Sequence, residues 1–302
     1  MDTTLPLRPA LGTETRGMLL GLAGVAMFSL TLPFTRMAVH DLPPAFVALG
    51  RALVAAVLAG AWLWHQRAAL PARAQLLPLA LVAGGCIVGF PWLTSIALRT
   101  VPAAHGAVLV GILPLATAIV SALRGHEKPS IGFWAMALLG SSLVMAFALR
   151  QGGGSLQAAD LLMLAAVVLA AIGYTEGGRL SQSMDGTLVI SWALVLAAPV
   201  LLVLLLWQCA GDWPQVAAAG ARAWAGFAYV SLFSMFIGFF FWYRGMALGG
   251  IARVGQVQLV QPFLTLVGAW ALLGEALSLD QFGFALAVIA VVAAGRKMRI
   301  RA

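Results

Sequence analysis

Glu176 is the acidic residue whose position in the sequence most directly suggests chemistry. It lies within a long apolar run, in Gly173-Tyr174-Thr175-Glu176, three residues before Arg179. An ionised side chain near the centre of a membrane helix costs at least about 2.5–3.5 kcal/mol, so it needs a compensating role. One interpretation is a cavity carboxylate that binds a cationic group or carries a coupling proton. The favoured interpretation is a structural pair with Arg179, because residues i and i+3 share one helix face.

A second polar feature is a stripe of side chains in the ninth apolar stretch of the chain. Gln258, Gln261 and Thr265 recur at helical spacing on one face, and Pro262 interrupts the backbone hydrogen bonds beside them. In lipid, such a face must turn toward protein. The two amides could then hydrogen-bond a polar solute, or they could only hold neighbouring helices together. Both interpretations stay open for Gln258 and Gln261.

Three other side chains complete the candidate site. His105 lies near the non-cytoplasmic start of a predicted helix and could titrate in the physiological range, although a lone histidine there is more often only hydrated. Trp92 and Trp242 could wall a cavity, with Tyr174 as a third aromatic residue, or could simply pack. The predicted substrate-binding residues are therefore Trp92, His105, Tyr174, Glu176, Trp242, Gln258 and Gln261.

Charged residues near predicted helix ends have simpler explanations. Glu127 and Glu275 lie at helix junctions, where each would cap the helix that follows it. Four arginines would reach the lipid headgroups or pair across the molecule, and contact with an anionic substrate is the less favoured alternative. These four are Arg36, Arg51, Arg244 and Arg253.

Composition identifies the solvent that surrounds these residues. Of 302 residues, 62% are hydrophobic and only 9% are charged, whereas a soluble domain has roughly 25% charged residues. The formal net charge of +8 would suggest nucleic acid in a soluble protein, but the basic residues lie mainly between apolar runs and indicate membrane orientation. The chain is therefore predicted to be an all-α polytopic membrane protein in a lipid bilayer, with no nucleic-acid partner.

Ten apolar stretches are long enough to predict transmembrane helices, each needing about 20 residues. The first continues too far to be a signal peptide, so it is predicted to be retained. The stretches cover approximately residues 17–38, 44–64, 76–98, 102–123, 131–149, 158–180, 188–208, 222–247, 252–273 and 279–295. Most Lys and Arg residues fall in the segments on one side of these stretches, which places the short tails 1–16 and 296–302 in the cytoplasm. The predicted location is the inner cell membrane.

The chain also contains an internal repeat. The pattern P-x-x-T-x9-E occurs from Pro114 to Glu127 and again from Pro262 to Glu275. Trp92 and Trp242 form a second matched pair, which divides the chain into halves of about 17–149 and 158–295. Five spans per half is an odd number, so the second half must enter the membrane from the opposite side. Inverted repeats of this kind are a recurring architecture of secondary transporters.

These repeated residues resemble the EamA unit of the drug/metabolite transporter superfamily. The matching positions are Ala97-Leu98, Pro114, Glu127 and Gly140 in the first half, Ala247-Leu248, Pro262, Gly274-Glu275 and Gly283 in the second, and Arg51-Ala52-Leu53 in the second stretch. Two departures are His126-Glu127 in place of Gly-Glu and Ser191-Trp192 where the first half has Gly50-Arg51. The resemblance implies ten helices around a central cavity lined by helices 1, 3, 4, 6, 8 and 9, often in an exporter of amino acids or other metabolites.

The leading functional hypothesis is a secondary transporter, an exporter of small metabolites such as amino acids, that works by alternating access between the two repeats. Its partner would be a small-molecule solute, and a homodimer is left open. The alternative is a membrane-embedded lipid-processing enzyme, which would need clustered catalytic groups. The sequence has no G-x4-GK[ST] motif for ATP, its four histidines are scattered, and Cys86 and Cys209 stand apart. No enzyme activity, cofactor or metal is therefore expected.

Overall fold

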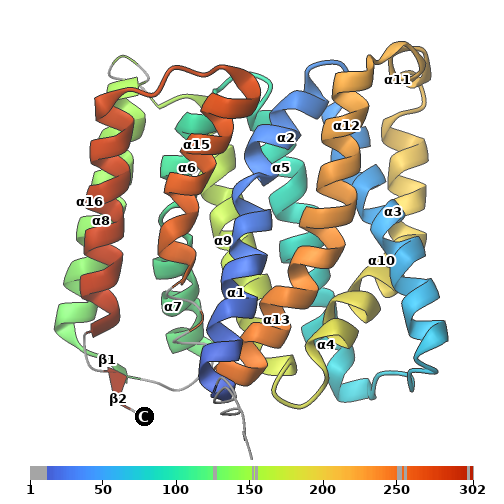
Figure 1. The fold of residues 1–302 in the computed structure, drawn as a ribbon, viewed down its shortest axis with the longest axis horizontal. Helices are drawn as coiled ribbons and strands as arrows, with labels where there is room; N and C mark the ends of the chain where they lie inside the picture. The colour runs from blue at the N-terminus through green and yellow to red at the C-terminus, as the bar shows by residue number, and fades with distance from the viewer. Residues whose placement is uncertain are drawn as a thin grey trace, which may run out of the picture.

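The structure, a computed structural model, describes residues 12–124, 128–151, 153, 156–249, 254, 257–297 and 300–301. Helices make up almost all of this part of the chain (Figure 1). Its strands are the two-residue segments β1 (Lys128–Pro129) and β2 (Ile300–Arg301), which pair antiparallel. The predicted all-helical class therefore holds apart from this short pair.

The first half of the chain folds into a series of helices joined by short turns. These are α1 (Thr13–Ser29), α2 (Thr31–Val39), α3 (Pro44–His65), α4 (Arg73–Val82), the π-helix η1 (Ala83–Gly89), α5 (Phe90–Ala97), α6 (Ala103–Val110), α7 (Leu113–Arg124) and α8 (Ile131–Gln151). Pro44 opens α3 at its first position, where the missing backbone N–H costs nothing.

The second half repeats this plan. It contains α9 (Ala158–Leu180), α10 (Gly186–Gln208), α11 (Trp213–Ala218), α12 (Ala221–Tyr229), the π-helix η2 (Val230–Ile237), α13 (Gly238–Gly249), the 3-10 helix η3 (Gln258–Val260), α15 (Gln261–Leu273) and α16 (Leu279–Lys297). Asp185 caps α10 by accepting a 2.8 Å hydrogen bond from the Thr187 backbone N–H. Gly274 ends α15 in a left-handed conformation, with φ of 68°.

Seven helices in the described residues are long and apolar enough to cross a membrane. They are Thr15–Val39, Pro44–His65, Arg73–Ala97, Ala103–Arg124, Ala158–Leu180, Gly186–Gln208 and Ala221–Gly249. The other predicted spans correspond to shorter apolar helices, Trp134–Arg150, Gln258–Leu273 and Leu279–Ala294. The chain is thus a multi-pass membrane protein, and ten crossings stay a prediction.

Several spans predicted as continuous are in fact interrupted. Leu30 separates α1 from α2, and α6 ends before Leu113 begins α7. The third and eighth spans each contain a π-helical turn, η1 and η2, just before the helices α5 and α13 that carry the matched Trp92 and Trp242. Pro33, Pro91 and Pro114 lie close after three of these four interruptions. Each proline weakens the helix there because it cannot donate a backbone hydrogen bond. Such turns let a helix bend and occur frequently at functional sites.

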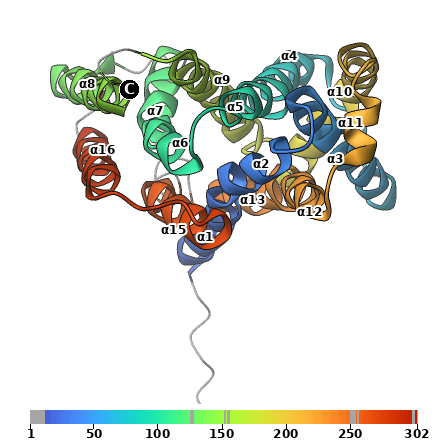
Figure 2. The ribbon, with the colours of Figure 1, turned by 90° about the horizontal axis from the view of Figure 1, so that it is seen from above.

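The two halves interlock instead of lying side by side as separate bundles. α1 packs on α13, and α9 packs on η1 and α5, so the first span of each half contacts the third span of the other. In the same way α3 packs on α10, α6 on α15, and α8 on α16. In Figure 1, α1 begins and α16 ends at the lower face, and α9 runs opposite to α1. Figure 2 shows this arrangement from above.

Glycines set the closest contact between α1 and α13. A Cβ added to Gly17 would lie 2.4 Å from the Gly249 backbone nitrogen, and one added to Gly245 would lie 2.7 Å from the nitrogen of Gly21. The Gly-x3-Gly spacing on each helix therefore allows backbone-to-backbone packing between the halves.

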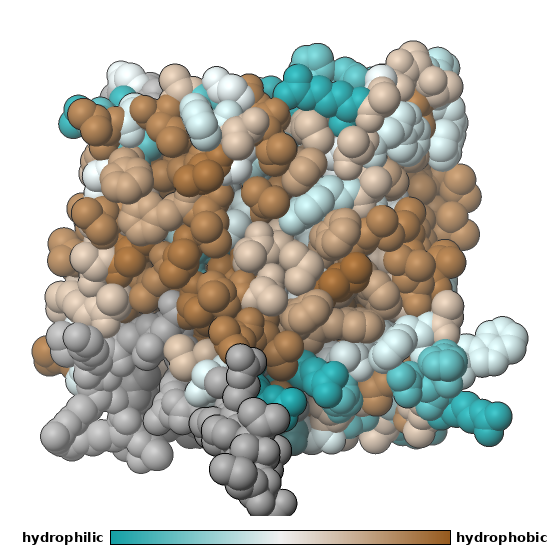
Figure 3. Space-filling view, in the orientation of Figure 1, coloured by the Kyte–Doolittle hydropathy of each residue, from teal (hydrophilic) through white to brown (hydrophobic). Residues whose placement is uncertain are grey.

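The outer surface suits a lipid environment. Figure 3 shows a broad apolar band across the middle of this face, with hydrophilic residues near its upper and lower edges. Exposed apolar side chains such as Val57 and Val203 belong to helices on the periphery. A surface of this kind is stable only when hydrocarbon surrounds it.

Candidate substrate-binding site

A small cavity lies at the centre of the molecule, where interrupted helices of both halves meet. We call it the central cavity, and it is lined by Phe28, Thr31, Leu32, Arg51, Cys86, Phe90, Val110, Leu113, Ala170, Tyr174, Ser234, Phe239 and Gln261. These residues come from the first, third, fourth, sixth, eighth and ninth spans, with Arg51 added from the second. Tyr174 and Gln261, two predicted site residues, are therefore in the lining.

The polar stripe of the ninth span borders an adjoining pocket. This pocket shares Leu32, Val110, Leu113 and Gln261 with the central cavity and adds Ala107, Pro114, Gln258, Pro262 and Thr265. Gln258 is 3% exposed, and its Nε2 has no hydrogen-bond partner among the described residues. Gln258 lies in the 3-10 turn η3, so the stripe spans a helix junction, not one continuous helix as predicted.

Aromatic rings form one wall of the central cavity. The Phe28 and Phe239 ring centroids are 4.9 Å apart, and those of Tyr174 and Trp242 are 5.8 Å apart. Trp242 is almost fully buried behind Tyr174 and is not part of the lining. Trp92 is partly buried against the apolar core, and neither cavity includes it.

Glu176 has a different partner from the one predicted. Its carboxylate is 2.6 Å from Nε of Arg124 on α7, whereas Arg179 is exposed. Glu176 is 4% exposed and lies near the lower end of α9. Because α7 belongs to the first half and α9 to the second, the pair joins the two halves. The i, i+3 pairing with Arg179 was wrong because the helix face of Glu176 turns toward α7, and the partner therefore comes from another helix.

His105 is buried, not hydrated as its position near a helix end suggested. Its Nε2 is 2.6 Å from Oδ1 of Asp160, and the two residues are 5% and 0% exposed. The other carboxylate oxygen of Asp160 accepts a hydrogen bond from the Gln157 backbone N–H at the start of α9. This pair joins α6 to α9 and thus one half to the other. Asp160 was not among the predicted site residues, although an acid at the start of an apolar stretch is a typical capping signal.

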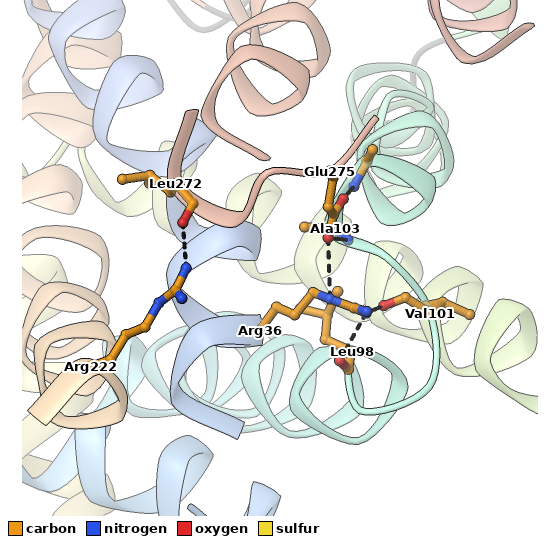
Figure 4. Close-up of polar contacts among 8 residues, drawn as sticks. Arg36, Leu98, Val101, Ala103, Arg222, Leu272 and Glu275 are labelled. Atoms are coloured by element: carbon orange, nitrogen blue, oxygen red, sulfur yellow. Dashed lines mark hydrogen bonds and ion pairs between the residues drawn. The ribbon is translucent and has the colours of Figure 1, made fainter. Parts of the chain in front are cut away.

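Glu275 caps a helix, but a different one from the helix predicted. Its carboxylate accepts hydrogen bonds from the backbone N–H groups of Ala103 (2.9 Å) and Ala104 (2.8 Å), which begin α6 in the other half (Figure 4). Arg36 lies 3.1 Å from the same carboxylate and also donates to the carbonyls of Leu98 and Val101. We call this group the Glu275 junction. It ties the upper ends of the two halves together. Glu127 lies outside the described residues.

Arg51 is the unusual cation of the site. The side chain is 2% exposed, it lines the central cavity, and none of the described residues accepts a hydrogen bond from its Nε or Nη1. It neither reaches the headgroups nor pairs across the halves. Arg36 does pair across the halves, Arg244 is exposed, and Arg253 lies outside the described residues.

Two interlocked helical halves around a central cavity define this molecule as a multi-pass membrane protein built from two related halves. The chain belongs to the EamA-like transporter family, whose model matches residues 15–147 and again residues 157–294. This finding confirms the family resemblance predicted from the sequence.

Known relatives agree with this assignment. The chain is 48% identical over 283 residues to the uncharacterized transporter YdeK of Bacillus subtilis (strain 168), an alignment that covers 94% of this chain and 98% of that protein. It is 23% identical to the uncharacterized transporter sll0355 of Synechocystis sp., covering 86% and 84%. One solved crystal structure shares the fold with a TM-score of 0.65 and 19% identity, covering 94% of this chain and 97% of the other.

Proposed function

We propose that this protein is a secondary transporter that exports small metabolites, amino acids among them, from the cytoplasm across the inner membrane. It would cross the bilayer ten times with both termini in the cytoplasm, so the lower face of Figure 1 would be the cytoplasmic face. The halves 17–149 and 158–295 would move against each other. The observation that carries this proposal is a central cavity lined by both halves.

Contacts between the halves at both ends of the cavity support alternating access. The Glu275 junction connects them at the upper face, and the Glu176–Arg124 pair connects them near the lower face. Opening the cavity to one side requires one of these contacts to break while the other persists. The π-helical turns η1 and η2 border the cavity and supply points where the helices can bend.

The direct test of transport is counterflow in liposomes that contain the purified protein. Vesicles loaded with an unlabelled solute should take up the same labelled solute above its equilibrium level, because a carrier exchanges solute in both directions. Product formation without solute flux would instead support the lipid-processing enzyme. The energy source would be the solute gradient or a coupled ion.

Replacing Glu176 by glutamine should abolish uptake driven by a pH gradient and leave counterflow intact. A carboxylate is the kind of group that can carry a coupling proton, whereas the glutamine amide keeps its size and hydrogen-bonding groups but cannot carry one. Uptake into proteoliposomes would be compared with and without an imposed pH gradient. Asp185→Asn is the matched control, since it removes an exposed acid but keeps a good helix cap. An unchanged response of Glu176→Gln to the gradient would return Glu176 to a structural role.

Gln258→Leu should weaken solute binding by about ten-fold, since one hydrogen bond contributes about 0.5–1.5 kcal/mol net and 1.4 kcal/mol is a factor of ten. The Gln258 amide nitrogen has no partner among the described residues and can bond a solute in the adjoining pocket. Affinity is measured by calorimetry on protein whose folding has been verified by its unfolding temperature. Gln182→Leu changes an exposed glutamine in the same way and should have no effect. Unaltered affinity in Gln258→Leu would make Gln258 a scaffold residue.

A further inference from the structure

Arg51 carries a charge that no residue in the described part of the chain neutralises. Among the described side chains that line the central cavity and the adjoining pocket, Arg51 is the single charged one. The side chain is 2% exposed, with Nε and Nη1 unbonded within the described structure. A buried, unpaired cation strongly destabilises a protein interior, and more so within a membrane. An anion bound beside Arg51 would therefore stabilise this site.

Three acids in the described part of the membrane-spanning core are engaged elsewhere. Glu176 pairs with Arg124, Glu275 pairs with Arg36, and Asp160 pairs with His105. Each of these contacts ties one helix to another, so releasing an acid to Arg51 would break a contact between the halves. Among the described residues, then, these acids are not available as the counter-charge, and we infer that a bound solute supplies it.

The rest of the lining indicates what kind of molecule carries that charge. Two hydroxyl groups of the lining, Thr31 and Ser234, bond to each other at 2.8 Å. The remaining surface is largely apolar and aromatic, and it includes Phe28, Tyr174 and Phe239. No acidic side chain among the described lining residues is available to bind an ammonium group. The surroundings favour one anionic group attached to an apolar body.

The internal repeat shows that this charge occurs once. Ser191-Trp192 stands in the second half where Gly50-Arg51 stands in the first. Trp192 is 8% exposed, and its indole carries no charge. An otherwise repeated cavity thus has a cation on one side only, which suits a solute with one carboxylate better than one with two. The planar guanidinium can bond both oxygens of a carboxylate.

We propose that Arg51 is the anion-binding residue of the central cavity and that the transported solutes carry a single carboxylate on an apolar body. Amino acids with apolar side chains belong to this class, as do acids that lack the amino group. Amines that lack the acid group do not. The proposal rests on the proposed transport function and names its substrate class.

Three probes that share one apolar body test this assignment. Leucine carries both ionic groups, 4-methylpentanoate carries only the carboxylate, and 3-methylbutylamine carries only the ammonium. Binding to the full-length chain in lipid nanodiscs is measured by calorimetry. Both acids should bind and the amine should not. Arg51→Gln should weaken binding of the acids by roughly 30-fold or more, and Arg51→Lys should weaken it less. Arg73→Gln, at the exposed start of α4, is the matched control.

A stability measurement separates binding from a structural role. Without solute, Arg51→Gln should raise the unfolding temperature because it removes an unpaired buried charge, whereas a structural arginine would lower it. Added 4-methylpentanoate should raise the unfolding temperature of the wild-type protein but not of this variant. If Arg51→Gln fails to fold, the three probes on the wild-type protein and on Arg51→Lys decide the matter.

Three results would overturn the assignment. They are binding of the amine as tightly as the acids, an affinity in Arg51→Gln within about three-fold of wild type, and failure of both acids to bind. If any of these results is found together with counterflow of a cationic or neutral solute, the transport function is supported and only the proposed substrate class is rejected. Absence of counterflow for every solute would instead count against the transport function itself.

Discussion

Gly85→Ala is expected to lower the unfolding temperature by several degrees or prevent folding, whereas Gly84→Ala, one residue earlier, is expected to have little effect. A Cβ on Gly85 would lie 2.2 Å from the carbonyl oxygen of Leu169 and 2.9 Å from the nitrogen of Gly173, both backbone atoms of α9. A Cβ on Gly84 would meet nothing within 4 Å. Overpacking a tight contact typically costs about 1–3 kcal/mol, and backbone atoms cannot move aside as side chains do.

The comparison is made on purified protein in detergent by thermal unfolding and gel filtration. Both glycines lie in the π-helix η1, so the effect of glycine-to-alanine substitution on the helix itself should be the same at the two positions. Only the contact with α9 differs between them. Equal unfolding temperatures for the two variants would show that η1 and α9 do not approach as closely as the structure has them.

Glu275→Gln should open the cavity toward the upper face. The substitution removes the charge that binds Arg36 and the first turn of α6, and hydrogen bonds to charged groups contribute about 1.5–3 kcal/mol each. Because that junction joins the two halves, its loss should shift the population toward the outward-open conformation by roughly ten-fold or more.

Cys86 provides a native reporter for this change. It is a free cysteine in the lining of the central cavity. The chain has two cysteines, so replacing Cys209 by alanine leaves Cys86 as the single thiol. A membrane-impermeant maleimide added outside intact cells should label Cys86 faster in Glu275→Gln than in the parent. Asp280→Asn, which breaks the exposed pair with Arg150 at the same face, should label at the parental rate. Equal rates for all three proteins would mean that the Glu275 junction does not close the cavity.

Much of the fold follows from local sequence. Apolar stretches of sufficient length, separated by Pro and Gly, predict the helices, and the matched Pro114 and Pro262 patterns predict two related halves. Interruptions were harder to predict. The π-helical turn η1 packs on α9 and η2 packs on α3, and no local pattern encodes contacts between residues far apart in the chain.

The site shows the same division between local and long-range information. Tyr174, Gln258 and Gln261 stood out because polar groups are rare in apolar helices, and they border the cavities. The ionic partners could not be predicted from spacing, since Glu176, Glu275 and His105 each bond to the other half of the chain. Arg51 was noticed, but only the folded structure shows that no described acid reaches it.

The most direct test of the central claim is the labelling of Cys86 from each side of the membrane. In the Cys209→Ala background, right-side-out and inside-out vesicles are exposed to the same impermeant maleimide, with and without solute. A carrier that exposes the cavity alternately predicts labelling of Cys86 from both sides, and a transported solute should slow both rates. Labelling from one side only, under every condition, would contradict alternating access and leave a cavity with a single entrance.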